Sequence, residues 1–211
     1  MRNSKLCSVV LVAALGAVVI CSQACSRPDS ASESAPPTEA PQQELVLQEL
    51  EFGGDFTLTG HTGQPVSLAD FRGRTVLIFF GFTHCPDVCP LTMSKITTAL
   101  GELGEAKKDV QVLFVTVDVD RDTPEQMANY VKSYDAPLTG LTGTREEVDR
   151  VVSAYKASYE ITPSDSAGGP QVSHTAYTYL VDRTGKLRHA FRYGDSPQTI
   201  AEGIKMVMAA S

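Results

Sequence analysis

Two strand-like runs, the first continuously apolar and the second largely so, constrain the fold of this 211-residue chain more than any other feature. They are TVLIFFG at Thr75–Gly81 and VQVLFVTV at Val110–Val117. A strand that is apolar at nearly every position is expected to be covered on both faces, as the central strands of α/β sheets are. A helical pattern at Val88–Leu103 separates the two runs. The sequence therefore predicts an α/β sheet with helices on both faces.

The flanking segments extend this pattern. Thr123-Pro-Glu-Gln and Thr144-Arg-Glu-Glu each place a glutamine or glutamate three residues after a threonine, which is typical of a helix start. The other predicted elements are a hairpin in DFTLTG-HTGQPVSLADFRGR, helix ends near Tyr134 and Tyr159, strands at Thr175–Val181 and Lys186–Arg192, and a last helix at Ser196–Met208. This order predicts an α/β thioredoxin-like fold: a central mixed sheet flanked by helices, with an N-terminal hairpin extension.

The N-terminus has the features of an export signal. Arg2 and Lys5 precede an uncharged run of 16 residues, Leu6–Cys21, which is shorter than the ~20 residues that span a bilayer comfortably. Small residues around Cys25 resemble a bacterial lipoprotein cleavage site, so Cys25 is the lipidation candidate and Cys21 the weaker one. An uncleaved anchor and ordinary secretory cleavage are the alternatives. All three place the following domain outside the cytoplasm, attached to a bacterial cell envelope in the first two cases.

Residues 26–44 contain four Pro and four Ser and nothing more apolar than Ala. Such a segment cannot bury enough surface to offset its chain entropy, so we expect a disordered tether. The predicted organisation is therefore a signal at 1–25, a tether at 26–44 and one folded domain at 45–211. The net charge of −7 argues against a nucleic-acid binder, which needs basic surface to displace counterions from phosphates. We expect a monomer.

The chemistry of the domain centres on Cys85 and Cys89 in GFTHCPDVCP, directly after the first apolar run. The carboxyl end of a strand is where α/β folds commonly place their sites. Pro90 is tolerated only in a first helical turn, so the helix is predicted to begin near Asp87–Cys89. Cys89 then lies at a helix N-terminus, where free amides favour the thiolate. A structural disulfide or simple packing is the alternative, and three intervening residues differ from the two of a redox C-x-x-C motif.

Two thiolates suit soft Cu(I) or borderline Zn(II), and either ion needs further ligands. Of the four histidines, His61 and His189 are expected to have surface or packing roles, and the His84 side chain is expected to point away from the cysteines. His174 follows a Gly/Pro-rich loop that opens the strand beginning at Thr175. If that strand pairs beside the first apolar run, the loop can fold over the cysteine pair.

Three segments together resemble the Sco/SenC family: GFTHCPDVCP, VTVDVDRDTPEQ and SHTAYTYLVDRTGKL. The similarity runs from about Gly53 to the last helix. It implies a thioredoxin fold and a role in assembling cytochrome c oxidase. It also implies that Cys85, Cys89 and His174 bind copper, as Cu(I) and Cu(II). Asp118 and Asp120 match an acidic stretch of the family, and we expect them to cap the strand end and the following turn.

The resemblance predicts a copper chaperone that delivers copper to the copper-site subunit of a terminal oxidase and exchanges it with other copper chaperones. The alternative is an enzyme, a thiol–disulfide reductase that uses Cys85 and Cys89 to keep the oxidase's copper-ligand cysteines reduced and does not need His174. A peroxiredoxin is disfavoured, because Phe82 stands where that class has Thr or Ser. A redox or copper sensor is a further alternative.

Overall fold

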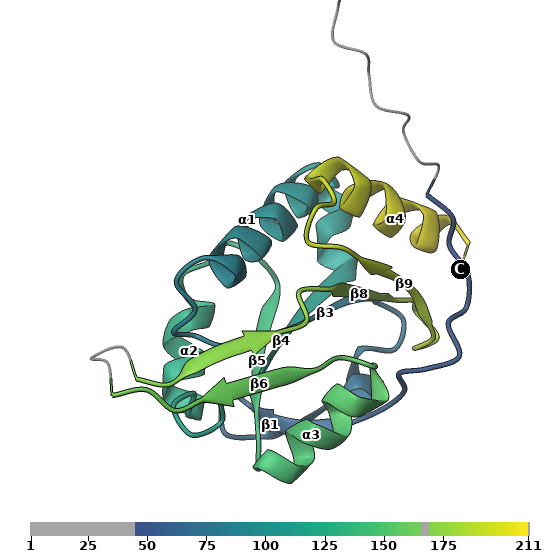
Figure 1. Cartoon of the computed structure of the whole chain (residues 1–211). Coiled ribbons are helices and arrows are strands. Elements are labelled where there is room, and N and C mark those ends of the chain that lie inside the picture. The colour runs from purple at the N-terminus through teal and green to yellow at the C-terminus, as the bar shows by residue number, and fades with distance from the viewer. Residues whose placement is uncertain (1–44, 166–168, 211) are drawn as a thin grey trace, which may run out of the picture. The chain divides into compact units, whose positions relative to one another are not determined.

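A seven-stranded mixed sheet is the centre of the computed structural model, which describes residues 45–165 and 169–210 (Figure 1). The predicted signal, Cys21, Cys25 and the tether lie outside the described residues. The strand order is β2-β1-β5-β4-β3-β8-β9, with β3, β4 and β5 parallel and the other pairs antiparallel. The strands are β1 (Thr57–Gly60), β2 (Pro65–Ser67), β3 (Thr75–Gly81), β4 (Val110–Thr116), β5 (Leu138–Thr142), β8 (Thr178–Val181) and β9 (Leu187–Phe191).

Helices cover both faces of this sheet. They are α1 (Val88–Gly101), α2 (Pro124–Val131), α3 (Arg145–Ala154) and α4 (Pro197–Ala209), with short 3-10 helices at Leu68–Phe71 and Gly104–Asp109. Neighbouring residues of β3 point to opposite faces. Phe79 contacts Phe114, which stacks on Tyr130 of α2, whereas Phe80 contacts Tyr155 at the end of α3. α1 packs against α4 (Figure 1). The predicted mixed sheet flanked by helices is confirmed.

The predicted helix starts are correct, but two predicted helix ends are not. Thr123 accepts a hydrogen bond from the Gln126 amide, and Thr144 forms a reciprocal capping box with Glu147. α2 ends at Val131 rather than near Tyr134, and α3 ends at Ala154 rather than near Tyr159. The chain leaves α3 at Lys156, whose φ of +52° is left-handed, a common way to end a helix.

A second, two-stranded sheet was not predicted. It consists of β6 (Tyr159–Thr162) and β7 (Gln171–His174), paired antiparallel outside the main sheet (Figure 1). His174 is therefore the last residue of a strand and not part of a loop, and the next strand begins at Thr178 rather than Thr175. The expected pairing of that strand, β8, beside β3 is confirmed.

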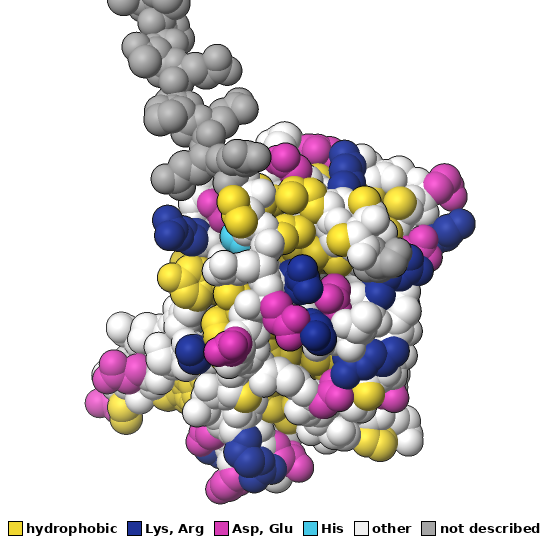
Figure 2. Space-filling view, turned by 90° about the vertical axis from the view of Figure 1, so that its right-hand side faces the viewer, with side chains coloured by type: hydrophobic (Ala, Val, Ile, Leu, Met, Phe, Trp, Pro, Cys, Tyr) yellow, Lys and Arg dark blue, Asp and Glu magenta, His cyan; other side chains and the backbone are white. Residues whose placement is uncertain are grey.

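The surface mixes both signs of charge. On the face in Figure 2, Lys and Arg side chains lie among Asp and Glu side chains rather than in one continuous basic area. Among the described residues, none of the helices has the length and apolar character needed to cross a bilayer.

Candidate metal centre

The end of β3 brings a cysteine close to the sheet. A Cβ on Gly81, the last residue of β3, would lie 2.9 Å from both the Cys89 Sγ and the Phe114 Cε2. Glycine at this position therefore allows the thiol to pack directly against the strand. α1 begins at Val88, as predicted, with Pro90 in its first turn.

This close contact gives a testable prediction. Gly81→Ala is expected to lower the free energy of unfolding by about 1–3 kcal/mol, because the added methyl overpacks a buried site. Urea unfolding of the reduced protein measures the change. Gly101→Ala is the matched control, since a Cβ there meets nothing within 4 Å. Equal stabilities of the two variants would contradict this account of Gly81.

The first cysteine of the pair is half-buried, and its sulfur is the acceptor for a helix amide. The Cys89 amide donates to the Cys85 Sγ at 3.4 Å, while the N-cap residue Asp87 makes no side-chain capping bond. The Cys85 sulfur thus satisfies one of the amides that a helix N-terminus leaves unpaired. The sequence predicted that the free amides of the helix N-terminus would act on the Cys89 sulfur. In the structure, the Cys89 amide donates to the Cys85 sulfur instead.

The second cysteine is fully buried, with none of its surface exposed. Burial raises the pKa of the Cys89 thiol well above its ordinary value, so in the metal-free protein Cys89 is a neutral thiol at pH 7. This outcome differs from the thiolate that its place in the first turn of α1 predicted. The cost of removing a charge from water exceeds the stabilisation that a helix terminus offers.

The imidazole of His174 lies against the buried thiol. Its Nε2 is 3.4 Å from the Cys89 Sγ, and its Nδ1 is 3.1 Å from the Thr175 carbonyl oxygen. Because a carbonyl only accepts, Nδ1 carries the proton and the Nε2 lone pair faces the sulfur. Burial lowers the pKa of His174, which favours the neutral ring that binds metals. The rings of Phe79 and Phe82 hold the imidazole edge-on.

Together, the ligand atoms of Cys85, Cys89 and His174 lie within 4.8 Å of one another. Within residues 45–165 and 169–210, this is the one group of three or more His, Cys, Asp or Glu side chains close enough to share a metal ion. Metal–sulfur bonds of about 2.3 Å and metal–nitrogen bonds of about 2.0 Å, as zinc shows, place such ligands about 3.6–3.8 Å apart. The spacing thus fits an ion after small adjustments, and the donor set suits soft or borderline metals.

The other histidines lie outside this group. His84 is near Thr83 and Asp122 rather than the cysteines. His61 accepts a hydrogen bond from the Gly140 amide, and the His189 ring packs on Phe191. These positions agree with the surface and packing roles that the sequence predicted.

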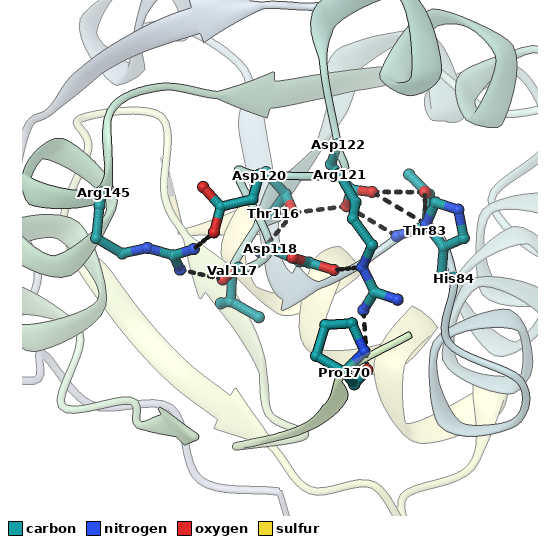
Figure 3. Close-up of polar contacts among 10 residues, drawn as sticks. All are labelled: Thr83, His84, Thr116, Val117, Asp118, Asp120, Arg121, Asp122, Arg145 and Pro170. Atoms are coloured by element: carbon teal, nitrogen blue, oxygen red, sulfur yellow. Dashed lines mark hydrogen bonds and ion pairs between the residues drawn. The ribbon is translucent and has the colours of Figure 1, made fainter. Parts of the chain in front are cut away.

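The acidic loop after β4 organises the surroundings of the site (Figure 3). The carboxylates of Asp118 and Asp120 pair with Arg121 and Arg145, so neither has the capping role that the sequence predicted. Asp122 has that role instead. Its buried carboxylate accepts from the Thr83 amide at 2.8 Å and from the hydroxyls of Thr83 and Thr116 at 2.6 Å. Sequence reasoning did not single out Asp122.

Comparisons with known proteins agree with this geometry. A family model described as SCO1/SenC matches residues 46–209. The human mitochondrial protein SCO1 homolog is 40% identical over 174 residues, which are 82% of this chain but only 58% of that protein. A SCO2-like protein of Rickettsia felis is 33% identical over 167 residues, which are 79% of this chain and 82% of that protein.

A solved structure of Bradyrhizobium japonicum ScoI with copper bound is also similar. It superposes with a TM-score of 0.68 at 36% identity, covering 74% of this chain and 99% of that chain. The likeness therefore extends over nearly all of that structure.

Proposed function

This chain belongs to the SCO1/SenC family, and from that premise we propose that it binds copper through Cys85, Cys89 and His174. We further propose that it delivers the copper to the copper site of a terminal cytochrome c oxidase during assembly. The observation that carries the proposal is the convergence of the three ligand atoms within 4.8 Å, although His174 follows Cys89 by 85 residues. The copper bound by the Bradyrhizobium japonicum relative supports the choice of metal.

The chain's own groups account for loading. In the metal-free protein, the Cys89 thiol faces the His174 Nε2, so copper would replace a proton that already lies between two ligands. Two thiolates and an imidazole suit Cu(I), and an added oxygen ligand would suit Cu(II). Oxidation of the cysteines to a disulfide would remove both sulfur donors, so loading requires reduced thiols.

The different burial of the ligands suggests the order of transfer. Cys85 and His174 are partly exposed, whereas Cys89 is fully buried. A ligand of the recipient protein could therefore approach from the side of Cys85 and His174, and the Cys89 sulfur would be released last. Such an associative exchange avoids a state in which the copper has lost its ligands.

Copper stoichiometry of the reduced protein tests this function. In competition with a chromophoric Cu(I) chelator, the wild type is expected to keep one equivalent, which Cys85→Ser and His174→Ala lose. His189→Ala is the control, because His189 packs on Phe191 away from the site. A wild-type value near zero would exclude the chaperone function.

The thiol–disulfide reductase is a second candidate, favoured by one observation. The half-buried Cys85 sulfur accepts a helix amide and is more accessible than the buried Cys89 sulfur, so it is the sulfur that could attack a disulfide. This reaction uses both cysteines but not His174. His174→Ala should therefore abolish tight copper binding and leave dithiol exchange intact, which separates the two functions.

The N-terminal predictions complete the proposal. Residues 1–25 would direct export and, with Cys25 lipidated, attach a monomer to the outer side of a bacterial membrane. Residues 26–44 would then let the domain at 45–211 reach an oxidase subunit, or another copper chaperone, at the same membrane. The predicted export signal and tether are based on the charged and apolar pattern of the first 25 residues and on the Pro/Ser composition of the next 19.

A further inference from the structure

The strand that carries His174 lacks the support of the main sheet. Among the residues that the structure describes, β6 and β7 pair only with each other. A two-stranded sheet is marginally stable by itself in water. The position of His174 relative to the cysteines therefore depends on side chains that tie this hairpin to the rest of the domain.

Arg145, the first residue of α3, makes such a tie. Its Nη1 donates to the Val117 carbonyl oxygen at 2.7 Å and to the Tyr159 hydroxyl at 3.1 Å, and its Nη2 donates to the Asp120 Oδ2 at 2.8 Å. Figure 3 shows the guanidinium reaching Val117 and Asp120. The guanidinium also lies 5.7 Å from the centre of the Tyr159 ring. Arg145 thus joins the end of β4 to the hairpin.

Tyr159 of β6 connects Arg145 to the strand that carries His174. In the β6–β7 register, Tyr159 pairs directly with His174. Fixing the Tyr159 side chain therefore fixes the backbone opposite His174. Tyr159 also donates a hydrogen bond from its hydroxyl to Asp149 of α3, which gives the same ring a second attachment to the domain.

A second arginine holds the other end of β7. Arg121 forms an ion pair with the buried Asp118 and donates to the Pro170 carbonyl oxygen at 3.3 Å, one residue before β7 begins (Figure 3). Its guanidinium also lies 5.9 Å from the centre of the Phe82 ring, which contacts the His174 ring. The hairpin is therefore attached at both ends by arginines bound to the loop after β4.

We propose that Arg145 and Tyr159 are positioning residues that keep the His174 Nε2 within bonding reach of the metal held by the cysteines. This inference rests on the proposed copper function. We assign the contribution of Arg145 to the position of His174 to its hydrogen bonds with Val117 and Tyr159. The Asp120 side chain is 82% exposed, so the ion pair between Arg145 and Asp120 contributes little. Partners that orient a metal-binding histidine typically change metal affinity 10–100-fold.

The test compares Arg145→Gln and Tyr159→Phe with the wild type. Competition with a Cu(I) chelator is expected to show roughly tenfold weaker binding in Arg145→Gln and a smaller loss in Tyr159→Phe, with one copper still bound at saturation. Arg72→Gln is the matched control, because Arg72 pairs with Asp55 in an exposed ion pair that does not involve the hairpin. Urea unfolding verifies that each variant is folded.

Two further measurements separate positioning from general destabilisation. On a His174→Ala background, Arg145→Gln should weaken binding no further, since it acts through His174. In the metal-free protein, NMR should show weaker contacts between the His174 and Phe82 rings and faster hydrogen exchange of the β7 amides in both hairpin variants. The Arg72→Gln control should change neither.

The outcomes distinguish failure of the positioning role of Arg145 and Tyr159 from failure of the proposed copper-binding function. If the wild type binds no copper, or His174→Ala binds as tightly as the wild type, the proposed function fails and the metal-free NMR decides the positioning role. If His174→Ala weakens binding but Arg145→Gln and Tyr159→Phe do not, the inference is wrong and the function stands. A full tenfold loss from Arg145→Gln without His174 would also overturn the inference.

Discussion

The metal-free protein is expected to lose several kcal/mol of unfolding free energy between pH 9 and pH 11. Burial raises the pKa of the Cys89 thiol above its ordinary value of 9.0. Burial likewise raises the pKa values of Tyr130 and Tyr155 above 10.0 and that of Tyr179 to about 12. Well below pH 9 all four groups are protonated in both the folded and the unfolded state. Above it, the unfolded chain releases protons that the folded protein keeps, so stability falls as the pH rises.

The size of the effect follows from the number of groups. Each one costs about 1.4 kcal/mol per pH unit above its ordinary pKa. By pH 11, Cys89 lowers the unfolding free energy over about two pH units, and each of the three tyrosines lowers it over about one pH unit. The total is comparable with the 5–15 kcal/mol that stabilises a typical domain, so the protein should unfold near pH 11.

Urea unfolding at pH 8, 9, 10 and 11, with a reductant and a copper chelator present, measures this loss. Tyr179→Phe should reduce the slope between pH 10 and pH 11 by one proton. Tyr193→Phe is the matched control, because Tyr193 is 40% exposed whereas Tyr179 is 1% exposed. An unfolding free energy that stays constant up to pH 11 would contradict the burial of these four groups.

The sequence predicted the centre of the fold because its signals there are local. The apolar runs at β3 and β4, the capping threonines of α2 and α3, and Pro90 in α1 each constrain their own segment directly. β5 was not predicted because it is only five residues long, is not continuously apolar and has a glycine at its centre. Its β character comes from pairing with β4 and from α2, since a Cβ on Gly140 would lie 3.0 Å from the Met127 Cε.

The structure shows that the three predicted site residues converge, but the sequence did not predict the burial and hydrogen bonds of each one. The motif around Cys85 and Cys89 and the family resemblance selected His174, and the structure brings the three together. The strand that carries His174 was missed because β6 and β7 have only four residues each, too few for their alternation of polar and apolar residues to stand out. Nor does the sequence distinguish the half-buried Cys85 sulfur from the buried Cys89 sulfur, because the burial of Cys89 depends on Gly81 of β3 and Phe114 of β4.

The same limit applies to the acidic loop Asp118–Asp122. Three aspartates alternate along it, and local pattern gives no reason to rank them. The structure separates them sharply: the Asp120 side chain is 82% exposed, and that of Asp122 is completely buried. Thr83 and Thr116 could have indicated a buried acceptor such as Asp122. Thr83 comes shortly after β3 and Thr116 ends β4, and each hydroxyl needs a hydrogen-bond partner there.

Asp122→Ala is therefore expected to lower the free energy of unfolding by about 3–5 kcal/mol, because it leaves a partly buried amide and two hydroxyls without their buried carboxylate acceptor. The Thr83 amide and hydroxyl lie two residues before Cys85, so the loop that carries Cys85 should also loosen. Asp122→Asn keeps one acceptor oxygen and should cost less, about 1–3 kcal/mol.

Urea unfolding and the rate of Cys85 alkylation by iodoacetamide measure the two effects. Asp120→Ala is the matched control, and it should change stability by less than about 1 kcal/mol because its ion pair with Arg145 is exposed to solvent. Alkylation should be faster in Asp122→Ala than in the control under conditions where both are folded. If the two variants behave alike in both measurements, Asp122 does not hold the cysteine loop, and the support of the Cys85 sulfur must come from α1 alone.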